Sequence, residues 1–538
     1  MSANLLLKSN AIFDSVKDEP FKGYVAIKGN KIVGVGSQSK DMESFIDEGT
    51  KVMEFGDRLI MPGFHDSHTH LILAGLFKTF VNLGASKDEA DAARMVKEYY
   101  DENPKNGWLI GFNWYHYRWP KKNFPSKETL DLYFKDQPVF LLNAEAHSAW
   151  VNSKALALAG ITRDTPNPFG GEIAKDEKGE PTGFLYEAAL APVAALAYDF
   201  SPEEEKELLI NFMETAKPLG ITSVVDVQPY FGRDLGSLSV FKEMEDQGML
   251  NVRIHAASNL FGDLDQAKEN SKVYKTGKVR ANLLKQFVDG VIPTHTALML
   301  EEYLDAPGNK GVQLNPLDDF EEAIMEAHRR ELSVKIHAIG DFAIRFTLDC
   351  FEKAIKKYGK NGARHAIEHC EMVDEADFQR FGELGIVPSV QPEHLGLIPS
   401  WEEEEYIPVL GEEKAGKTWS FKRLLTEAGV LAIGSDCPVV DNNPFNEIHR
   451  GVSRLHDDQL PEGGWNPTQK LTVAEVLRGY TYGSAYGVGR EDELGTLAPN
   501  QLADVVVIDR NLFTVPHQDI RNANVDLTIM DGNIIFER

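Results

Sequence analysis

The feature that most constrains the fold is an alternation of short apolar, β-branched runs with longer stretches of helical spacing through the middle of the chain. The runs lie at residues 59–64, 220–226, 252–256, 282–288, 332–337, 364–369, 385–390 and 430–434. Amphipathic stretches lie between them, most clearly at 318–331 and 374–384. This alternation predicts a (β/α)8 TIM barrel of the α/β class and argues against an all-α bundle or a β-sandwich for this region.

The remaining residues predict two further units. Residues 5–13 and 24–35 near one end, and 503–509 and 526–537 near the other, are predicted strands, with hairpin turns at Gly29-Asn30 and Asp531-Gly532. We expect residues 1–58 and 486–538 to form one small β-sandwich domain built from both termini, beside a barrel of residues 59–80 and 211–485. The gap between the first two barrel strands is too long for one crossover, so residues 81–210 are expected to form an inserted subdomain that shapes the substrate pocket.

Composition limits the class of function. The chain has 56 Lys and Arg against 83 Asp and Glu, a formal net charge of −27, and such an anionic surface disfavours nucleic acid as a partner. Apolar stretches fall far short of the roughly 20 residues that a membrane helix needs, and no signal peptide is evident at the N-terminus. The 3 scattered cysteines fit a reducing compartment. We therefore expect a cytoplasmic protein that acts on a small molecule, and base rates favour a homodimer.

Candidate metal ligands occur at the C-terminal ends of the predicted barrel strands, the face where barrel enzymes carry their functional groups. They are His68, His70, Lys285, His337, His369 and Asp436. His68 and His70 are two residues apart, so their side chains share one face of a strand. Each residue taken alone is more often a core or surface group, but together they form a nitrogen and oxygen ligand set. Such a set suits Zn²⁺, with Mn²⁺, Fe²⁺ or Co²⁺ as alternatives.

Lys285 needs its own explanation, because an ammonium group beside two dications would be repelled. A buried lysine has a lowered pKa, and its neutral amine reacts with CO₂ to give a carbamate, whose two oxygens can bridge metals about 3.5–4 Å apart. The alternative is that Lys285 stays an amine beside a single metal. In both cases the metal would activate water and polarise a carbonyl group. Asp436 would carry the water's proton to the leaving nitrogen, and the ligand His369 is the second residue that we assign to catalysis.

These motifs resemble the amidohydrolase superfamily, and most closely its amidohydrolase-3 (YtcJ-like) metal-dependent hydrolases. The resemblance is carried by Met61–His70, His147–Leu156, Lys285–Gly290, His337–Asp341, Arg364–His369, Gly434–Val439 and Gly495–Val507. It implies His-x-His on the first strand, a carboxylated Lys285 on the fourth, one His each on the fifth and sixth, and Asp436 on the eighth. It also implies a hydrolase that cleaves an amide-like C–N bond, with N-substituted formamides as one known kind of substrate.

Three further residues are candidates for contacting the substrate. His147 lies in a segment that carries the resemblance, and His394 follows the seventh predicted strand. Trp114 belongs to an aromatic cluster at residues 108–119, which is either a pocket wall or a local core of the insert.

Two other functions stay open. Related deaminases usually use one metal and a Glu shortly after the fifth-strand His, whereas Ala338-Ile-Gly-Asp follows His337 here. A non-catalytic binding relative would be expected to have lost part of the ligand set, and all six positions are kept.

Overall fold

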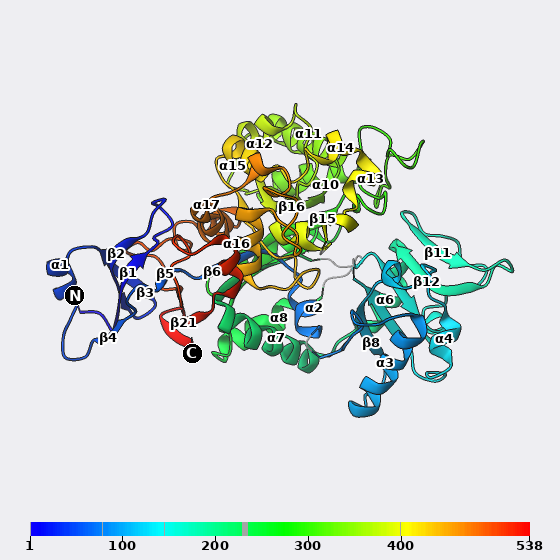
Figure 1. Cartoon of the computed structure of the whole chain (residues 1–538), viewed down its shortest axis with the longest axis horizontal. Helices are drawn as coiled ribbons and strands as arrows, with labels where there is room; N and C mark the ends of the chain where they lie inside the picture. The colour runs from blue at the N-terminus through cyan, green and yellow to red at the C-terminus, as the bar shows by residue number, and fades with distance from the viewer. Residues whose placement is uncertain (1, 78, 145, 229–234, 399) are drawn as a thin grey trace.

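The computed structural model describes residues 2–77, 79–144, 146–228, 235–398 and 400–538. Three bodies lie side by side in Figure 1: a sheet that contains both ends of the chain, a central barrel with its helices, and a smaller α/β unit. The three bodies correspond to three separate sheets. Within the described residues, no helix is both long and apolar enough to cross a membrane.

The central sheet is an almost closed barrel of eight parallel strands in the order β19-β18-β17-β16-β15-β14-β13-β6. The strands are β6 (Phe64–Thr69), β13 (Ile221–Asp226), β14 (Arg253–Asn259), β15 (Val279–Phe287), β16 (Ser333–Ala338), β17 (Ala366–His369), β18 (Val387–Val390) and β19 (Ala432–Ile433). The edge strands are joined where the Asp436 N–H donates to the His68 carbonyl at 2.7 Å and the His70 N–H donates to the Cys437 carbonyl at 2.8 Å. The TIM barrel is therefore confirmed, and its seam closes at predicted metal ligands.

The prediction for the first barrel strand is wrong. Leu59–Pro62 form β5, which pairs with β20 (Val505–Ile508) and β1 (Leu5–Ile12) in the sheet of the termini. The barrel strand β6 begins only at Phe64, and its sequence, Phe-His-Asp-Ser-His-Thr, is polar although every residue in it is buried. The hydrophobic pattern therefore predicted β5 instead of β6. It missed β6 because most residues of this strand are polar side chains of the candidate site and do not form an apolar core.

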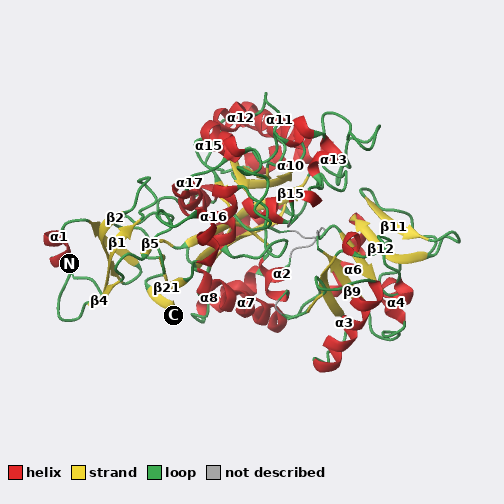
Figure 2. Cartoon of the chain, in the orientation of Figure 1, coloured by secondary structure: helices red, strands yellow, loops and turns green. Residues whose placement is uncertain are grey.

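Helices cover the outside of the barrel between successive strands (Figure 2). They are α8 (Leu238–Asp246), α9 (Leu264–Val273), α10 (Leu317–Arg329), α11 (Asp341–Tyr358), α12 (Phe378–Leu384) and α15 (Phe421–Ala428). Helix α10 buries Phe320, Ile324 and Ala327, at the spacing of one helical face, and keeps acidic residues in its first turn. The two helices predicted most clearly, α10 and α12, are confirmed.

The sheet of the termini has the order β22-β21-β20-β5-β1-β2-β3, with β4 (Lys51–Glu54) also paired to β1. Its other strands are β2 (Phe21–Lys28), β3 (Lys31–Gly36), β21 (Val525–Met530) and β22 (Asn533–Glu537). Both predicted hairpins, β2–β3 and β21–β22, are confirmed. Val25 and Ile27 of β2 share one core with Leu527 and Ile529 of β21, so the expected sandwich is a single sheet folded back on itself.

The third sheet is the insertion after the first barrel strand, with the order β11-β12-β10-β9-β8-β7. Its strands are β7 (Val81–Asn82), β8 (Leu109–Trp114), β9 (Val139–Asn143), β10 (Ser148–Val151), β11 (Gly171–Lys175) and β12 (Pro181–Glu187). The accompanying helices are α3 (Glu89–Glu102), α4 (Lys127–Asp131), α5 (Ser153–Leu158) and α6 (Ala191–Ala197). Helix α7 (Pro202–Ala216) then leads the chain back into β13.

Candidate metal centre

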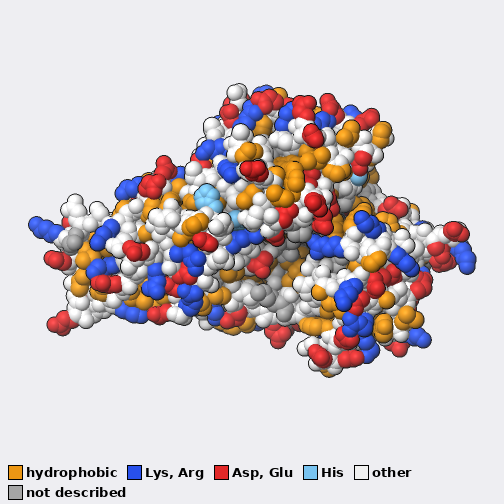
Figure 3. All heavy atoms as spheres, in the orientation of Figure 1, with side chains coloured by type: hydrophobic (Ala, Val, Ile, Leu, Met, Phe, Trp, Pro, Cys, Tyr) orange, Lys and Arg blue, Asp and Glu red, His pale blue; other side chains and the backbone are white. Residues whose placement is uncertain are grey.

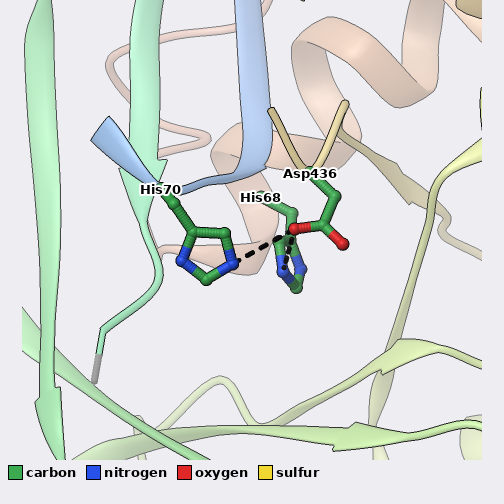
Figure 4. Close-up of side chains that lie close together, drawn as sticks. All are labelled: His68, His70 and Asp436. Atoms are coloured by element: carbon green, nitrogen blue, oxygen red, sulfur yellow. Dashed lines mark ion pairs between the residues drawn. The ribbon is translucent and has the colours of Figure 1, made fainter. Parts of the chain in front are cut away.

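Asp436 is the centre of the candidate site. Its Oδ1 lies 3.3 Å from His68 Nε2 and 3.2 Å from His70 Nε2, and Figure 4 shows both rings directed toward this carboxylate. His68 lies on β6, His70 directly precedes α2 (Leu71–Leu76), and Asp436 follows β19. The three buried residues offer ligand atoms within 4.8 Å of one another, and imidazole and carboxylate are ligands that divalent metals such as Zn²⁺ take.

A second group of residues shares the same carboxylate. His394 Nε2 is 3.5 Å from Asp436 Oδ2, and His369, His394 and Asp436 also offer ligand atoms within 4.8 Å of one another. The ring of His369 packs against those of His68 and His337, with centroids 4.9 and 4.4 Å apart. The structure therefore places His394, which the sequence suggested as a substrate contact, among the candidate ligands.

Lys285 lies on β15 and is fully buried. Among the described residues its Nζ has no hydrogen-bond partner, and it lies 4.6 Å from the centroid of the Phe287 ring. Burial lowers the pKa of Lys285 to about 8, although the carboxylates of Glu368 and Asp436 act to raise it. The amine is therefore partly neutral at mildly alkaline pH, which is the protonation state that a carbamate requires.

The protonation states of three further candidate ligands, Asp436, His337 and His369, suit a metal. Burial alone would raise the pKa of Asp436, but the imidazoles of His68 and His70 hold it well below its usual range. Burial, with a further contribution from Lys285, holds the pKa of His337 well below its ordinary value, and burial does the same for His369. An ionised carboxylate and neutral imidazoles are the forms in which these side chains bind metal ions.

The ring of His68 is held by a buried carboxylate that the sequence analysis did not assign. His68 Nδ1 lies 2.6 Å from Glu368 Oε2, and Lys335 Nζ donates to Glu368 Oε1 at 2.8 Å. A carboxylate on Nδ1 fixes the tautomer of a ligating histidine and directs Nε2 at the metal. The signal in the sequence is a charged residue in each of two otherwise apolar neighbouring strands, Lys335 in β16 and Glu368 in β17.

Backbone strain is concentrated around the site. His369, Cys370 and Asp436 have φ values of 72°, 49° and 61°, and left-handed conformations cost non-glycine residues of order 1 kcal/mol or more. Close approach adds a second constraint, because a Cβ on Gly434 would lie 2.4 Å from the His68 backbone nitrogen. The chain therefore holds the candidate ligands in place through tight packing at the barrel seam.

A cavity of about 680 Å³ opens above these residues and is bordered by both the barrel loops and the insert. His337, His369, His394 and Asp436 line it, together with His147 of the insert. His147 Nδ1 lies 3.0 and 2.9 Å from the two carboxylate oxygens of Glu187. The structure therefore brings His147 to the same cavity as the candidate ligands.

Trp114 does not border the cavity. It is fully buried, its indole N–H donates to the Leu141 carbonyl at 2.8 Å, and its ring packs against Trp119 and Trp150. The aromatic cluster is thus mainly a local core of the insert. Of its members, Tyr115 and Tyr117 line the cavity instead. A further acidic residue of the cavity, Glu371, was not assigned from the sequence.

The donor set fits a divalent metal. Like Lys285 Nζ, the buried atoms His369 Nδ1 and His394 Nε2 have no hydrogen-bond partner among the described residues. Buried polar atoms without partners are rare in folded proteins. His68, His70, His337, His369, His394, Lys285 and Asp436 are the residues that would hold one metal or two.

Comparison with known proteins shows the family and the fold of the chain. The model of the amidohydrolase family (Amidohydro_3) matches residues 51–536. The chain is 30% identical to the protein LONG AFTER FAR-RED 3 of Arabidopsis thaliana, over 99% of this chain and 92% of that protein. It is 25% identical to the N-substituted formamide deformylase of Arthrobacter pascens, over 96% of this chain and 95% of that enzyme. An uncharacterized metal-dependent hydrolase from Pyrococcus horikoshii has the same fold, with a TM-score of 0.77 at 24% identity over 96% of this chain and 99% of that one.

Proposed function

The chain belongs to the amidohydrolase family, and from that premise we propose that it hydrolyses an amide, formamide or related acyl-amine C–N bond of a small molecule. The observation that carries this proposal is the Asp436 carboxylate, which faces His68 and His70 through one oxygen and His394 through the other. One divalent metal, or two bridged by carboxylated Lys285, would activate water and polarise the carbonyl of the substrate. Zn²⁺ is the metal that we propose.

Asp436 is proposed to move the proton in this reaction. Its pKa is held well below the ordinary range by the neighbouring imidazoles, so it enters the reaction ionised and can accept a proton from water. Its position in the wall of the cavity allows the same oxygen to return that proton to the leaving nitrogen. His369 is proposed to hold the metal beside it.

His147 is proposed to contact the substrate carbonyl from the insert side of the cavity. The carboxylate of Glu187 on Nδ1 favours the tautomer that is protonated there, and it fixes the orientation of the ring. Glu187 itself sits at a φ of 48° at the end of β12, and its Oε1 is close to Gly290, whose carbonyl faces His337 Nε2 at 3.3 Å. The contact of Glu187 with Gly290 brings the insert close to His337. It supports the proposal that His147 acts on the same bond as the candidate metal centre.

The experiment that tests the proposed function combines metal analysis with a substrate screen. Protein grown with zinc and bicarbonate is analysed for metal per chain by plasma mass spectrometry, and amine release is followed from a panel of N-formyl and N-acyl amines. We expect about two metal equivalents and hydrolysis of part of the panel. One equivalent with ammonia release from amino-heterocycles would favour the deaminase alternative. No metal uptake and no turnover would favour a binding protein instead.

A further inference from the structure

Glu371 places a buried negative charge in the wall of the cavity. The residue is 3% exposed and lines the cavity beside His369 and His394. Tyr406 Oη donates to Glu371 Oε2 at 2.6 Å, whereas His394 Nδ1 is 3.9 Å from Oε1, too far for a hydrogen bond. Within the part of the chain that the structure describes, no Lys or Arg forms an ion pair with Glu371. A buried carboxylate with no counter-ion is costly, so this geometry suits a positively charged ligand.

Two aromatic rings lie beside this carboxylate. Tyr406 and Trp419 both line the cavity, and their ring centroids are 5.7 Å apart at an interplanar angle of 51°. The backbone N–H of Trp419 donates to the backbone carbonyl of Glu371 at 2.8 Å. Trp419 is held there at a φ of 59°, a conformation that bulky residues rarely adopt. Aromatic faces attract cations, and most strongly where water is excluded.

The mouth of the cavity adds to the negative potential. Four consecutive glutamates, Glu402–Glu405, line it from the barrel side. The run begins within a short 3-10 turn at Trp401–Glu403 and ends directly before α13 (Tyr406–Leu410). The basic residues that line the same cavity, Arg118 and Lys122, are exposed on the insert. Figure 3 shows acidic, basic and hydrophobic side chains adjoining on the face where the insert meets the barrel.

We propose that the cavity takes a substrate that carries an organic cation, such as a protonated or quaternary amine, with Glu371 as its counter-ion and the rings of Tyr406 and Trp419 against it. This inference rests on the proposed function, because it names the substrate class of that same pocket. Glu371 follows His369 by two residues, so the cation would sit next to the bond that is cleaved. The substrate class is therefore an acyl-amine with a cationic group close to its scissile C–N bond.

The test uses two probes that differ in charge and hardly in shape. Choline and 3,3-dimethylbutan-1-ol are titrated by calorimetry into metal-loaded, full-length protein, and the quaternary nitrogen of choline cannot ligate a metal. We expect choline to bind at least about tenfold more tightly than the alcohol, the size of effect that a desolvated cation–aromatic and ion-pair contact produces. Glu371→Gln keeps the shape of the side chain and is expected to abolish this preference.

Two further variants sharpen the test. Tyr406→Phe removes the hydroxyl that holds the carboxylate and is expected to reduce the preference for choline by a smaller factor. Glu383→Gln removes an exposed charge on α12, away from the residues that line the cavity, and is expected to leave the preference within about twofold of the wild type. Thermal unfolding of each variant checks that it is folded, and a Glu371 variant that does not fold leaves Tyr406→Phe as the deciding comparison.

Equal binding of the two probes by wild-type protein, or binding of neither, would overturn the proposal. So would a Glu371→Gln protein that keeps the preference, and a loss of metal with the preference retained would assign Glu371 to supporting His394 instead. The proposed function fails separately, because it is judged by metal content and amine release. A chain that hydrolyses neutral amides without preferring cations would keep its function and lose this inference.

Discussion

Asp436 is proposed to be both a metal ligand and the proton carrier. The substitution Asp436→Asn separates these two roles. The amide keeps an oxygen toward His68 and His70 but cannot accept a proton from water. We expect metal content close to the wild type and a fall in kcat of about 10²–10⁴-fold, the usual contribution of a positioned acid or base. Metal analysis and steady-state kinetics on the best substrate of the panel check this. Asp441→Asn, in the same loop but exposed, is the matched control, and undiminished turnover in Asp436→Asn would refute the assignment.

Lys285 is the residue whose chemical form matters most. Its buried Nζ has no partner among the described residues and a pKa lowered to about 8, so the amine can react with CO₂ as the pH rises. Lys285→Ala removes the amine that would carry the proposed carbamate, and we expect lower metal occupancy together with lower activity. Acetate or propionate should restore part of both, because a small carboxylate can occupy the vacated space. Full occupancy with full activity in the variant would rule out a bridging carbamate.

At the scale of elements, Glu187 at the end of β12 orients the side chain of His147 in the neighbouring loop. Glu187→Gln weakens the contact with His147 Nδ1, so the ring is held less firmly in its orientation. We expect kcat to fall by about tenfold or more, with metal content unchanged. Glu177→Gln, exposed in the turn of the same hairpin, is the matched control. An unchanged kcat with reduced thermal stability would mean that Glu187 acts only in the packing of the insert.

Helix α10 contacts the residue that directly precedes β17 through two buried histidines. His328 Nδ1 lies 2.9 Å from His365 Nε2, and the Val334 N–H donates to His365 Nδ1 at 3.1 Å. Burial lowers the pKa of His365 to about 3, so the unfolded chain binds a proton between about pH 6.5 and 3 that the folded chain does not. The free energy of unfolding therefore falls as the pH drops below 6.5, by about 3 kcal/mol at pH 4 from this residue.

Urea unfolding at several pH values tests this sign. We expect His365→Asn to be less stable than the wild type at pH 7 but to lose less stability between pH 7 and 4.5. His517→Asn, an exposed histidine near the C-terminus, serves as the control. A parallel pH dependence in wild type and His365→Asn would show that His365 does not contribute.

The sequence pattern predicted strands and helices correctly where their residues serve only to fill the apolar core. It failed where the residues of a strand belong to the candidate site. The apolar runs of β13 to β19 and the helical face of α10 follow from burial, and both were predicted. The polar residues of β6 belong to the candidate metal centre, so the hydrophobic pattern favoured Leu59–Pro62 as the first barrel strand. Trp114 and Glu371 show the remaining limit. Whether a side chain such as Trp114 or Glu371 lies in a cavity or in a core depends on which sheet or loop packs over it. The spacing of residues along the chain does not predict this long-range packing.

At the scale of the whole molecule, the barrel is bounded by two bodies with different roles. The sheet of the termini is tied to the barrel strand β14 by Arg253, which is buried and donates to Asp504 at 2.7 and 2.9 Å and to Asp531 at 3.0 Å. The insert borders the cavity and contributes His147 and Tyr115 to it. One body therefore supports the scaffold, and the other forms part of the wall of the cavity.

The candidate centre joins parts of the chain that are far apart in sequence, so metal should stabilise the molecule as a whole. Its residues come from β6 and the residue that follows it, from β15, β16 and β17, and from the segments after β18 and β19. The unfolded chain cannot bring them together. Metal at about 100 times its Kd would add about 2.7 kcal/mol of stability, which corresponds to a few degrees in Tm for a chain of this size. Scanning calorimetry of chelator-treated and reconstituted protein measures this difference. His70→Ala should reduce the shift on reconstitution, because one ligand is lost, whereas Asp441→Asn should keep it. Equal Tm values with and without metal would mean that the site is either not filled or not coupled to the fold, and the hydrolytic mechanism would lose its physical basis.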